Sequence, residues 1–308
     1  MKSSNIGGQA VLEGIMMKNG DNYAVAVRKP DGEIALKIEE YKSIIHLKSI
    51  KKLPFIRGIF NFIDSLVLGM QTLTFSASFF EEEEMVELSD VAVAKKEKQE
   101  KVIMGATVAF SIVMAAGIFM VLPYLLTSGL SKVVPSMALR SVIEGIVRLV
   151  IFIGYVLLIS RMKDIRRVFM YHGAEHKCIN CIEHGQELTI ENVKASSKQH
   201  KRCGTSFLLF VMLVSIILFF FIRVESPVYR VVIRIALLPI IAGISYELIK
   251  WAGNSDNRFV GMLSKPGLWL QRLTTKEPED DMIEVAICAV EAVFDWKDYL
   301  KKNFEEQV

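Results

Sequence analysis

The sequence is poor in cysteine and histidine, and its charges nearly balance. Its 308 residues include four cysteines and five histidines, and the formal net charge is only +3. A charge this small gives no reason to expect a nucleic-acid partner. Four cysteines in so long a chain, without a secretory signal, favour reduced thiols or metal ligands over a disulfide framework.

The first twenty residues lack a long apolar run and the small-residue cleavage site that would follow one. We therefore expect them to belong to the folded protein and not to a cleaved signal peptide. The sequence also shows no internal repeat and no low-complexity tract. Repeat architectures and long disordered tracts are thus disfavoured.

Apolar residues are what the chain has in excess. They make up 52% of it, and the mean hydropathy is +0.35. Four apolar stretches, 103–126, 139–160, 205–223 and 229–250, are each close to the roughly 20 residues that cross a bilayer as a helix. The sequence thus predicts a mainly α-helical, polytopic membrane protein with about four transmembrane helices.

The polar parts of the chain suggest smaller elements. Residues 22–40 alternate apolar and polar side chains around Pro30-Asp31-Gly32, which predicts a β-hairpin. Residues 53–80 are apolar but carry Arg57 and Asp64, which favours an amphipathic helix on the membrane surface over a fifth inserted segment.

The segments on either side of the apolar stretches complete this outline. The charged residues that follow position 80 have no apolar period and predict a solvated linker. Residues 261–273 predict an amphipathic interfacial helix anchored by Trp269, and Thr275 before an acidic run predicts a capped helix start. The chain is thus divided into an N-terminal β-containing region 1–50, an interfacial helix and linker 51–102, a first helix pair 103–160, a His/Cys-rich loop 161–204, a second helix pair 205–250 and an amphipathic region 251–308.

The basic residues predict how the chain is oriented. The loop between the two helix pairs contains nine of them: Arg161, Lys163, Arg166, Arg167, Lys177, Lys194, Lys198, Lys201 and Arg202. The short loops contain little beyond Lys132 and two arginines beside the helices. The positive-inside rule therefore places the long loop in the cytoplasm of a plasma-membrane protein. With four spans, both termini are cytoplasmic as well.

Charged residues also occur inside the predicted spans. Arg140, Glu144 and Arg148 share one helix face, and Arg230 and Arg234 share another. An intramembrane acid is costly unless it is paired. We expect Glu144 to pair with an arginine of its own or a facing helix; a polar pathway for a solute is the less favoured alternative.

Potential metal ligands are concentrated in one segment. Four of the five histidines and three of the four cysteines lie between residues 160 and 204. His172 and His176 are four residues apart, so a helix would place both on one face. Glu175 completes the pattern H-x-x-E-H, in which the glutamate acts as general base and not as a ligand. The pattern predicts a zinc-like site with Glu175 as catalytic residue.

The remaining ligands are not determined by spacing. Candidates within the loop are His200, Cys203, Cys178 and Cys181, and Glu247 near the cytoplasmic end of the fourth span is another. Two interpretations without catalysis remain open. In the first there is no metal site: Glu175 forms ion pairs with lysines of the basic loop, and Gly173 weakens the helix that would bring His172 and His176 together. Cys178-x-x-Cys181 could instead form a closed structural zinc site with His200 or Cys203, and a redox dithiol ranks last.

Five blocks of the sequence resemble one known family. They are GGQAVLEGIMM (7–17), YHGAEHKCINCIEHG (171–185), QHKRCGTSF (199–207), GISYELIKW (243–251) and KPGLWLQRLTTKEP (265–278). Together they are similar to the YqhQ-like bacterial membrane proteins, a family of unknown function whose members are predicted metal-dependent enzymes. The resemblance implies a role for His172, Glu175, His176, His200, Arg202, Cys203 and Glu247.

The N-terminal block allows two interpretations. Gln9 and Glu13 lie between glycines, so this segment either folds back beside the His/Cys-rich loop or forms a tight glycine turn before the hairpin.

The leading hypothesis is a membrane-embedded, metal-dependent hydrolase at the cytoplasmic membrane surface, acting on a membrane-embedded peptide or a lipid-linked substrate. His172 and His176 bind a zinc-like ion, and Glu247, or His200 with Cys203, completes the ligands. The rival is a non-enzymatic docking or assembly factor that uses the cluster to fold the loop. Homo-oligomers are compatible with both. A transporter is disfavoured, because the sequence shows no inverted repeat.

Overall fold

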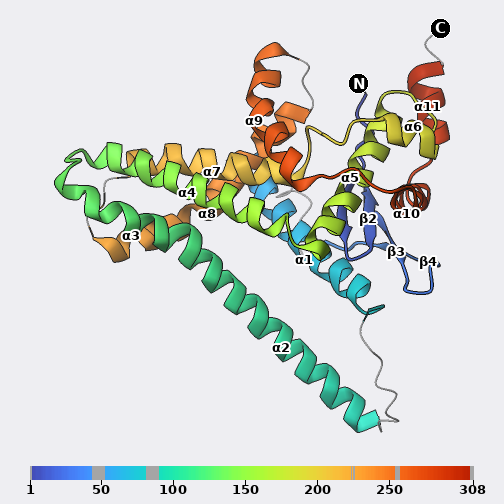
Figure 1. Ribbon diagram of the computed structural model, residues 1–308, viewed down its shortest axis with the longest axis horizontal. Helices are drawn as coiled ribbons and strands as arrows, with labels where there is room; N and C mark the ends of the chain where they lie inside the picture. Colours follow the sequence, from blue (N-terminus) through green and yellow to red (C-terminus); the bar gives the residue numbers. More distant parts are fainter. Residues whose placement is uncertain are drawn as a thin grey trace. The chain divides into compact units, whose positions relative to one another are not determined.

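The computed structural model describes residues 2–43, 53–80, 90–222, 224, 226–253 and 257–305. Four strands open the chain: β1 (Gly7–Val11), β2 (Gly14–Asn19), β3 (Asn22–Arg28) and β4 (Ile34–Glu40). The helices are α1 (Ile56–Ala77), α2 (Asp90–Ala116), α3 (Leu122–Ser128), α4 (Met137–Ile159), α5 (Lys163–Glu183), α6 (Ile190–Ala195), α7 (Gly204–Phe221), α8 (Pro227–Gly253), α9 (Arg258–Thr274), α10 (Asp280–Glu291) and α11 (Trp296–Leu300). Figure 1 labels most of them. The chain divides into two compact units, one of residues 1–80, 156–214 and 237–308, the other of 81–155 and 215–236.

Four helical segments are long and apolar enough to cross a membrane: Val102–Ser128, Met137–Ile159, Gly204–Phe221 and Val228–Gly253. They match the four predicted spans within a few residues at each end. The expected class, a mainly α-helical membrane protein with a small N-terminal β region, is confirmed. A π-helical turn, Gly117–Val121, joins α2 to α3.

The N-terminal region is larger than the predicted hairpin. The strands form one antiparallel sheet in the order β1-β2-β3-β4. The Pro30-Asp31-Gly32 turn lies where it was expected, between β3 and β4, and Gly32 has φ +88°. The prediction missed β1 and β2 because β1 begins with two glycines and β2, GIMMKN, does not alternate.

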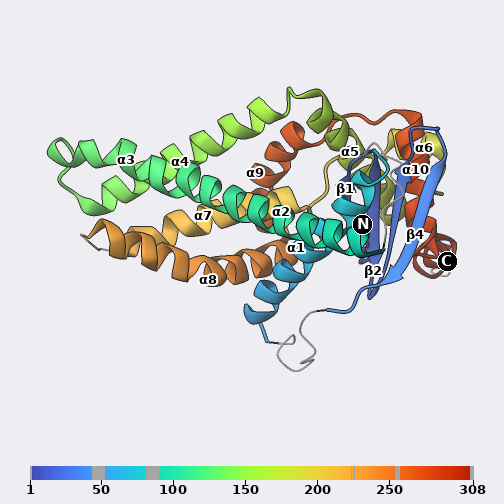
Figure 2. The ribbon, with the colours of Figure 1, turned by 90° about the horizontal axis from the view of Figure 1, so that it is seen from below.

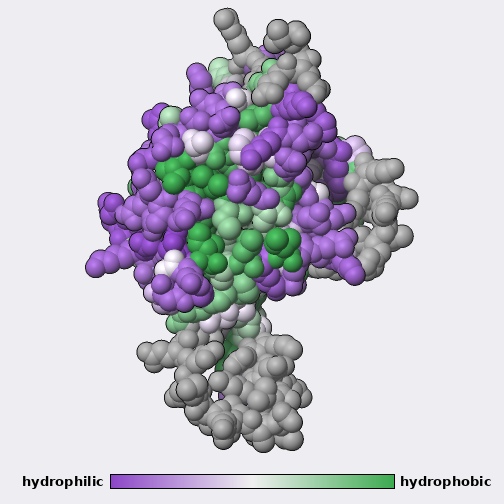
Figure 3. Space-filling model, turned by 90° about the vertical axis from the view of Figure 1, so that its right-hand side faces the viewer, coloured by the Kyte–Doolittle hydropathy of each residue, from purple (hydrophilic) through white to green (hydrophobic). Residues whose placement is uncertain are grey.

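Helices cover both faces of this sheet, as Figures 1 and 2 show. On one face, Ile15 and Met17 of β2 pack with residues of α5 and α10 such as Ile182 and Ile283. On the other face, Val25 of β3 belongs to a second core that includes Leu68 of α1. Each buried aliphatic side chain of this kind stabilises the fold by about 1.5–3 kcal/mol. The surface around the sheet that faces the viewer in Figure 3 is largely hydrophilic, with smaller groups of hydrophobic residues between the polar ones.

Three predicted segments differ from the structure. Of the expected linker, 81–89 lies outside the described residues, and 90–101 belongs to helix α2, because its Lys, Glu and Ala residues favour a helix. The expected helix start at Thr275 is wrong: α10 begins at Asp280, and the Thr275 hydroxyl donates to Gln271 O, 2.7 Å away. Residues 53–80 contain one helix, α1, which packs on the sheet; its position at the membrane surface stays a prediction.

The acid within the second span is paired as expected. Both carboxylate oxygens of Glu144 accept hydrogen bonds from Arg234, and Arg148 Nη2 lies 3.2 Å from Glu144 Oε1. Arg148 also contacts the Ser215 hydroxyl at 3.3 Å. These groups belong to the same compact unit. The carboxylate therefore ties two candidate spans together, which supports a structural role for it.

A second buried carboxylate, Glu183 at the end of α5, anchors the N-terminus. It is fully buried and accepts hydrogen bonds from Ser4 N (2.7 Å), the Ser4 hydroxyl (2.8 Å) and Arg202, while His200 Nε2 lies 3.3 Å away. Burial raises the pKa of Glu183, but the hydrogen bonds from His200 and Ser4 and the charge of Arg202 outweigh burial and hold this pKa at about 2.

We expect Glu183→Gln to lower the free energy of unfolding by about 3 kcal/mol, because the half-buried Arg202 charge loses its partner. The stabilisation from Glu183 is complete above the pKa of about 4.3 in the unfolded chain and is lost as pH falls through about 2. Thermal unfolding in detergent, followed from pH 7 to pH 2, should show the difference between the two proteins shrinking below pH 4 and nearly vanishing at pH 2. Glu187→Gln, an exposed neighbour, is the control. Equal melting temperatures at pH 7 would contradict this account.

Candidate metal centre

The site is built on α5, which is buried from Gly173 to Glu183 although this stretch contains two glutamates, a histidine, a lysine and an asparagine. The sequence predicted a polar His/Cys-rich loop for 161–204, with a helical turn assumed at His172 and His176, and the structure has a helix over Lys163–Glu183. Gly173 does not break it. A Cβ at this position would lie 2.0 Å from Lys276 O, so glycine allows the segment after α9 to approach the helix closely. The helix places the rings of His172 and His176 together, with centroids 4.4 Å apart.

Three side chains in the described part of the chain form a group that could hold a metal ion: His172, His176 and Cys203. Their ligand atoms all lie within 4.8 Å of one another, and His172 Nε2 is 3.2 Å from Cys203 Sγ. Cys203 directly precedes α7 and comes to the histidines from a segment 27 residues beyond His176. Two imidazoles and a thiolate are ligands that zinc prefers.

Backbone carbonyls orient both histidines. His172 Nδ1 lies 2.9 Å from Thr274 O, and His176 Nδ1 lies 2.8 Å from Lys198 O. A carbonyl can only accept, so each Nδ1 carries a proton and donates it. Each Nε2 is then the atom that can bind a metal. Histidine ligands of metals are usually held in this way by a second hydrogen bond.

The charges in the group also suit a cation. Burial raises the pKa of the Cys203 thiol, but the adjacent His172 and His176 outweigh burial and hold this pKa well below its usual range. Burial lowers the pKa of His172, yet the neighbouring Cys203 and Glu175 raise it to about 9. A proton on His172 Nε2 and a metal ion therefore compete for the same position beside a thiolate.

Glu175 lies beside the group without belonging to it. It is buried, and the backbone N–H of Gly8 in β1 donates to its carboxylate. Burial raises its pKa, and the nearby histidines oppose that rise. A Cβ on Gly8 would lie 2.9 Å from Glu175 Cδ. Only a glycine in β1 leaves this carboxyl group in place, so the N-terminal block folds back beside the helix.

The structure does not bring the other predicted ligands into the group. His200 is buried with its ring 5.9 Å from that of His176, but its Nε2 faces Glu183. Glu247 binds the Arg57 guanidinium through both carboxylate oxygens. Cys178 is in the hydrophobic core, and the Cys181 thiol lies 3.3 Å from Glu187 O. The C-x-x-C pair is thus buried in the protein interior and does not belong to the group of His172, His176 and Cys203.

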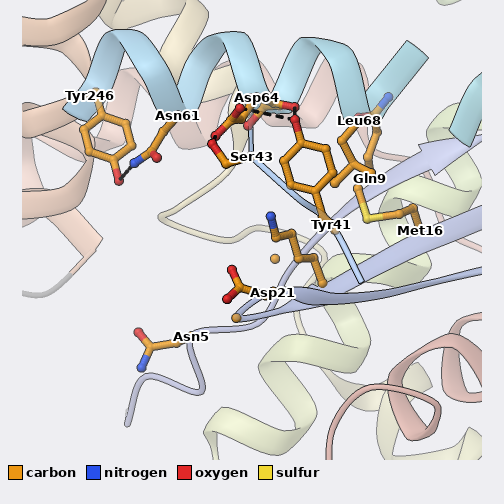
Figure 4. Close-up of a pocket in the computed structure, with 15 residues that line it drawn as sticks. Asn5, Gln9, Met16, Asp21, Tyr41, Ser43, Asn61, Asp64, Leu68 and Tyr246 are labelled. Carbon is orange, nitrogen blue, oxygen red and sulfur yellow. Dashed lines mark hydrogen bonds between the residues drawn. The ribbon is translucent and has the colours of Figure 1, made fainter. Parts of the chain in front are cut away.

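Three hollows meet at Gly8. A small one of about 100 Å³ contains His172, Glu175, His176, His200 and Cys203. A larger one of about 620 Å³ shares His172, Glu175 and Cys203 and extends past apolar residues of α1 and α7. A third, of about 480 Å³, is polar (Figure 4). In it Asn61 donates to the Tyr246 hydroxyl (2.7 Å), and Asp64 accepts from Tyr41 (3.2 Å).

Sequence reasoning missed the groups that hold the site in shape. Arg167 donates two hydrogen bonds to Glu13 in the turn after β1, and the Tyr171 hydroxyl lies 3.3 Å from the same carboxylate. Together with Gly8, these contacts fix β1 to α5. In the sequence, the glycines and the single acid of the block GGQAVLEG were the features that could have indicated this contact between β1 and α5. Thr274 O and Lys198 O left no signal, because any residue supplies a carbonyl.

Fold and site together define a polytopic α-helical membrane protein with a His–His–Cys group beside a small antiparallel sheet. Residues 53–296 match the family described as "Protein of unknown function (DUF1385)", and the chain belongs to this family. It is 35% identical over 288 residues to "Uncharacterized protein YqhQ" of Bacillus subtilis (strain 168), which covers 91% of this chain and 89% of that protein. No solved structure matches the chain. The expected family is thus confirmed, and a metal-dependent activity stays a prediction.

Gly173→Ala should disturb the site through the backbone. The new methyl group displaces Lys276 and with it the nearby Thr274 carbonyl that orients His172. We expect a loss of about 2 kcal/mol in unfolding free energy and weaker metal retention. Gly261→Ala is the matched control, because a Cβ at Gly261 in α9 meets nothing within 4 Å. Thermal unfolding and metal content of both variants check this; equal values for the two would refute the close-approach argument.

Proposed function

We propose that the chain is a membrane-bound, metal-dependent hydrolase that holds a zinc-like ion with His172, His176 and Cys203. One observation carries the proposal: two imidazoles, each oriented by a backbone carbonyl, present Nε2 to the same buried thiol. Three protein ligands are typical of catalytic zinc sites, whereas structural sites usually have four. The small hollow around these atoms supports a reactive site.

The catalytic roles follow from the neighbours of the group. A zinc ion bound there supplies Lewis-acid polarisation and lowers the pKa of water. Glu175 accepts the proton of the attacking water and returns it to the leaving group. Gly8 N–H holds the carboxylate in place, and burial raises its pKa. Thr274 O and Lys198 O keep the histidines in the ligating tautomer.

We further infer that this site lies on the cytoplasmic side of the membrane. The segment that contains it begins with Arg161, Lys163, Arg166 and Arg167, directly after the candidate span that ends at Ile159. The positive-inside rule supports the cytoplasm for such a segment. Reduced cysteines agree with that compartment, since all four thiols are free.

The primary test is the metal content of the protein purified in detergent without added metal. We expect about one transition-metal ion per wild-type chain by elemental mass spectrometry, and its loss in His172→Ala, His176→Ala and Cys203→Ala. His184→Ala and Cys288→Ser remove the same residue types outside the group and should retain the ion. A wild type that binds no metal after controlled reloading, or a Cys203→Ala variant that keeps it, would rule out the proposed ligands.

Glu175→Gln separates an enzyme from a docking factor. The amide keeps the size of the side chain but cannot accept a proton, so the metal should stay while hydrolysis falls about a hundredfold or more. Pools of fluorogenic peptides, esters and amides serve as the assay. Glu187→Gln controls for the loss of charge. If Glu175→Gln hydrolysed the same substrates at the wild-type rate, Glu175 would not be the general base.

A further inference from the structure

Strand β1 is an open edge of the sheet in the described part of the chain, where it pairs only with β2. The N–H of Leu12, directly after β1, donates to the Ser76 hydroxyl 3.2 Å away and so faces away from β2, as does the N–H of Gly8 beside Glu175. Backbone groups of alternate residues in an antiparallel pair face the same way. The N–H and C=O of Ala10 therefore also face outward, whereas those of Gln9 face β2.

This open edge forms a wall of the larger hollow. Gly8, Gln9 and Ala10 line the space of about 620 Å³ that also contains His172, Glu175 and Cys203. The adjoining walls come from α1, through Phe62 and Leu66, and from α5, through Val168 and Phe169. The same two helices cover opposite faces of the sheet. The hollow thus continues the plane of the sheet beyond β1.

The far wall of the hollow is mainly apolar. Phe207 and Leu208 of α7 and Ile249 of α8 contribute to it, and Phe207 contacts Phe62 with ring centroids 5.3 Å apart. These residues lie near the ends of two candidate membrane spans. The volume is within the usual range of ligand pockets. A ligand here would meet outward-facing peptide groups on one side and apolar side chains on the other.

We propose that the substrate is an extended peptide segment that pairs with the outer edge of β1 as an additional strand in front of Glu175. This rests on the proposed hydrolase function and names its substrate class. Pairing with Ala10 fixes the peptide backbone, and alternate side chains point toward the apolar wall. A lipid chain has no hydrogen-bond donors or acceptors that could pair with the N–H and C=O groups of this edge. A peptide is therefore favoured over a lipid-linked substrate.

The reaction is the hydrolysis of one peptide bond of that segment. Water adds to the carbonyl carbon as its proton passes to Glu175. The C–N bond then breaks, and the proton moves from Glu175 to the leaving amine. One carboxylate and one amine are formed, and no oxidant or reductant takes part.

The test measures peptide binding to the purified full-length Glu175→Gln protein in detergent, with its metal content verified first. The probe is a pool of dye-labelled decapeptides in which Leu, Val or Phe alternate with Ser or Thr. A bound member is then resynthesised with a single N-methylated amide at each position in turn. We expect methylation at the pairing amides to weaken binding about three- to tenfold, since each loses one hydrogen bond, and methylation at the intervening amides to have little effect.

Ala10→Pro tests the same contact from the protein side. Proline removes an N–H that faces away from β2, so the sheet can keep its own ladder. Ile38→Pro is the matched control. It lies on β4, the opposite edge, and the bonds Lys29 N to Glu33 O and Tyr41 N to Asp21 O indicate that Ile38 N–H also faces outward. Ala10→Pro should retain metal and lose peptide affinity, and Ile38→Pro should retain both.

The outcomes distinguish this inference from the proposed function. A protein that carries its metal but binds no decapeptide, or binds without sensitivity to N-methylation, overturns the inference and leaves the metal site standing. Displacement of a bound decapeptide by short-chain phospholipid, with no effect of Ala10→Pro on either ligand, would show a lipid pocket and also overturn it. A protein without metal would refute the proposed hydrolase, whatever it binds.

Discussion

Helix α5 is buried although it contains charged and polar side chains, and their need for hydrogen-bond partners organises the segments around it. Helix α5 is buried from Gly173 to Glu183, and a buried polar group without a partner costs about 1–3 kcal/mol. Lys177 Nζ donates to Lys194 O and Ser196 O, and Asn180 donates to Ser197 O and Gln199 O. The side chains of α5 thus fix the path of segment 194–199, because that backbone satisfies them.

The candidate metal group is a consequence of this arrangement. The carbonyl of Lys198 in the same segment orients His176, and Cys203 lies four residues beyond the end of the segment at residue 199. From the other side, Thr274, the last residue of α9, supplies its carbonyl to His172, next to the close approach of Lys276 O at Gly173. Glu183 closes the arrangement by binding the N-terminal Ser4 and Arg202. Ligands and orienting groups therefore come from segments far apart in sequence, held together by one helix.

The sequence was most informative where a pattern is local. Runs of about 20 apolar residues identified the four candidate spans, and a four-residue spacing placed His172 and His176 on one face. Which residues from distant parts of the chain complete the site could not be predicted from a local pattern. Cys203, His200 and Glu247 were equal candidates until Glu183 and Arg57 were seen to engage the last two. Strand β1 was missed because it begins with two glycines, which strands usually avoid, and one of them, Gly8, is required here for contact with Glu175.

The central claim is that two histidines and one cysteine bind the same ion. X-ray absorption spectroscopy at the edge of the metal that copurifies with the wild-type protein tests this most directly. We expect one sulfur neighbour at about 2.3 Å and two imidazole nitrogens at about 2.0–2.1 Å, with a light atom as fourth neighbour. A first shell without sulfur, or with two or more sulfurs, would contradict it.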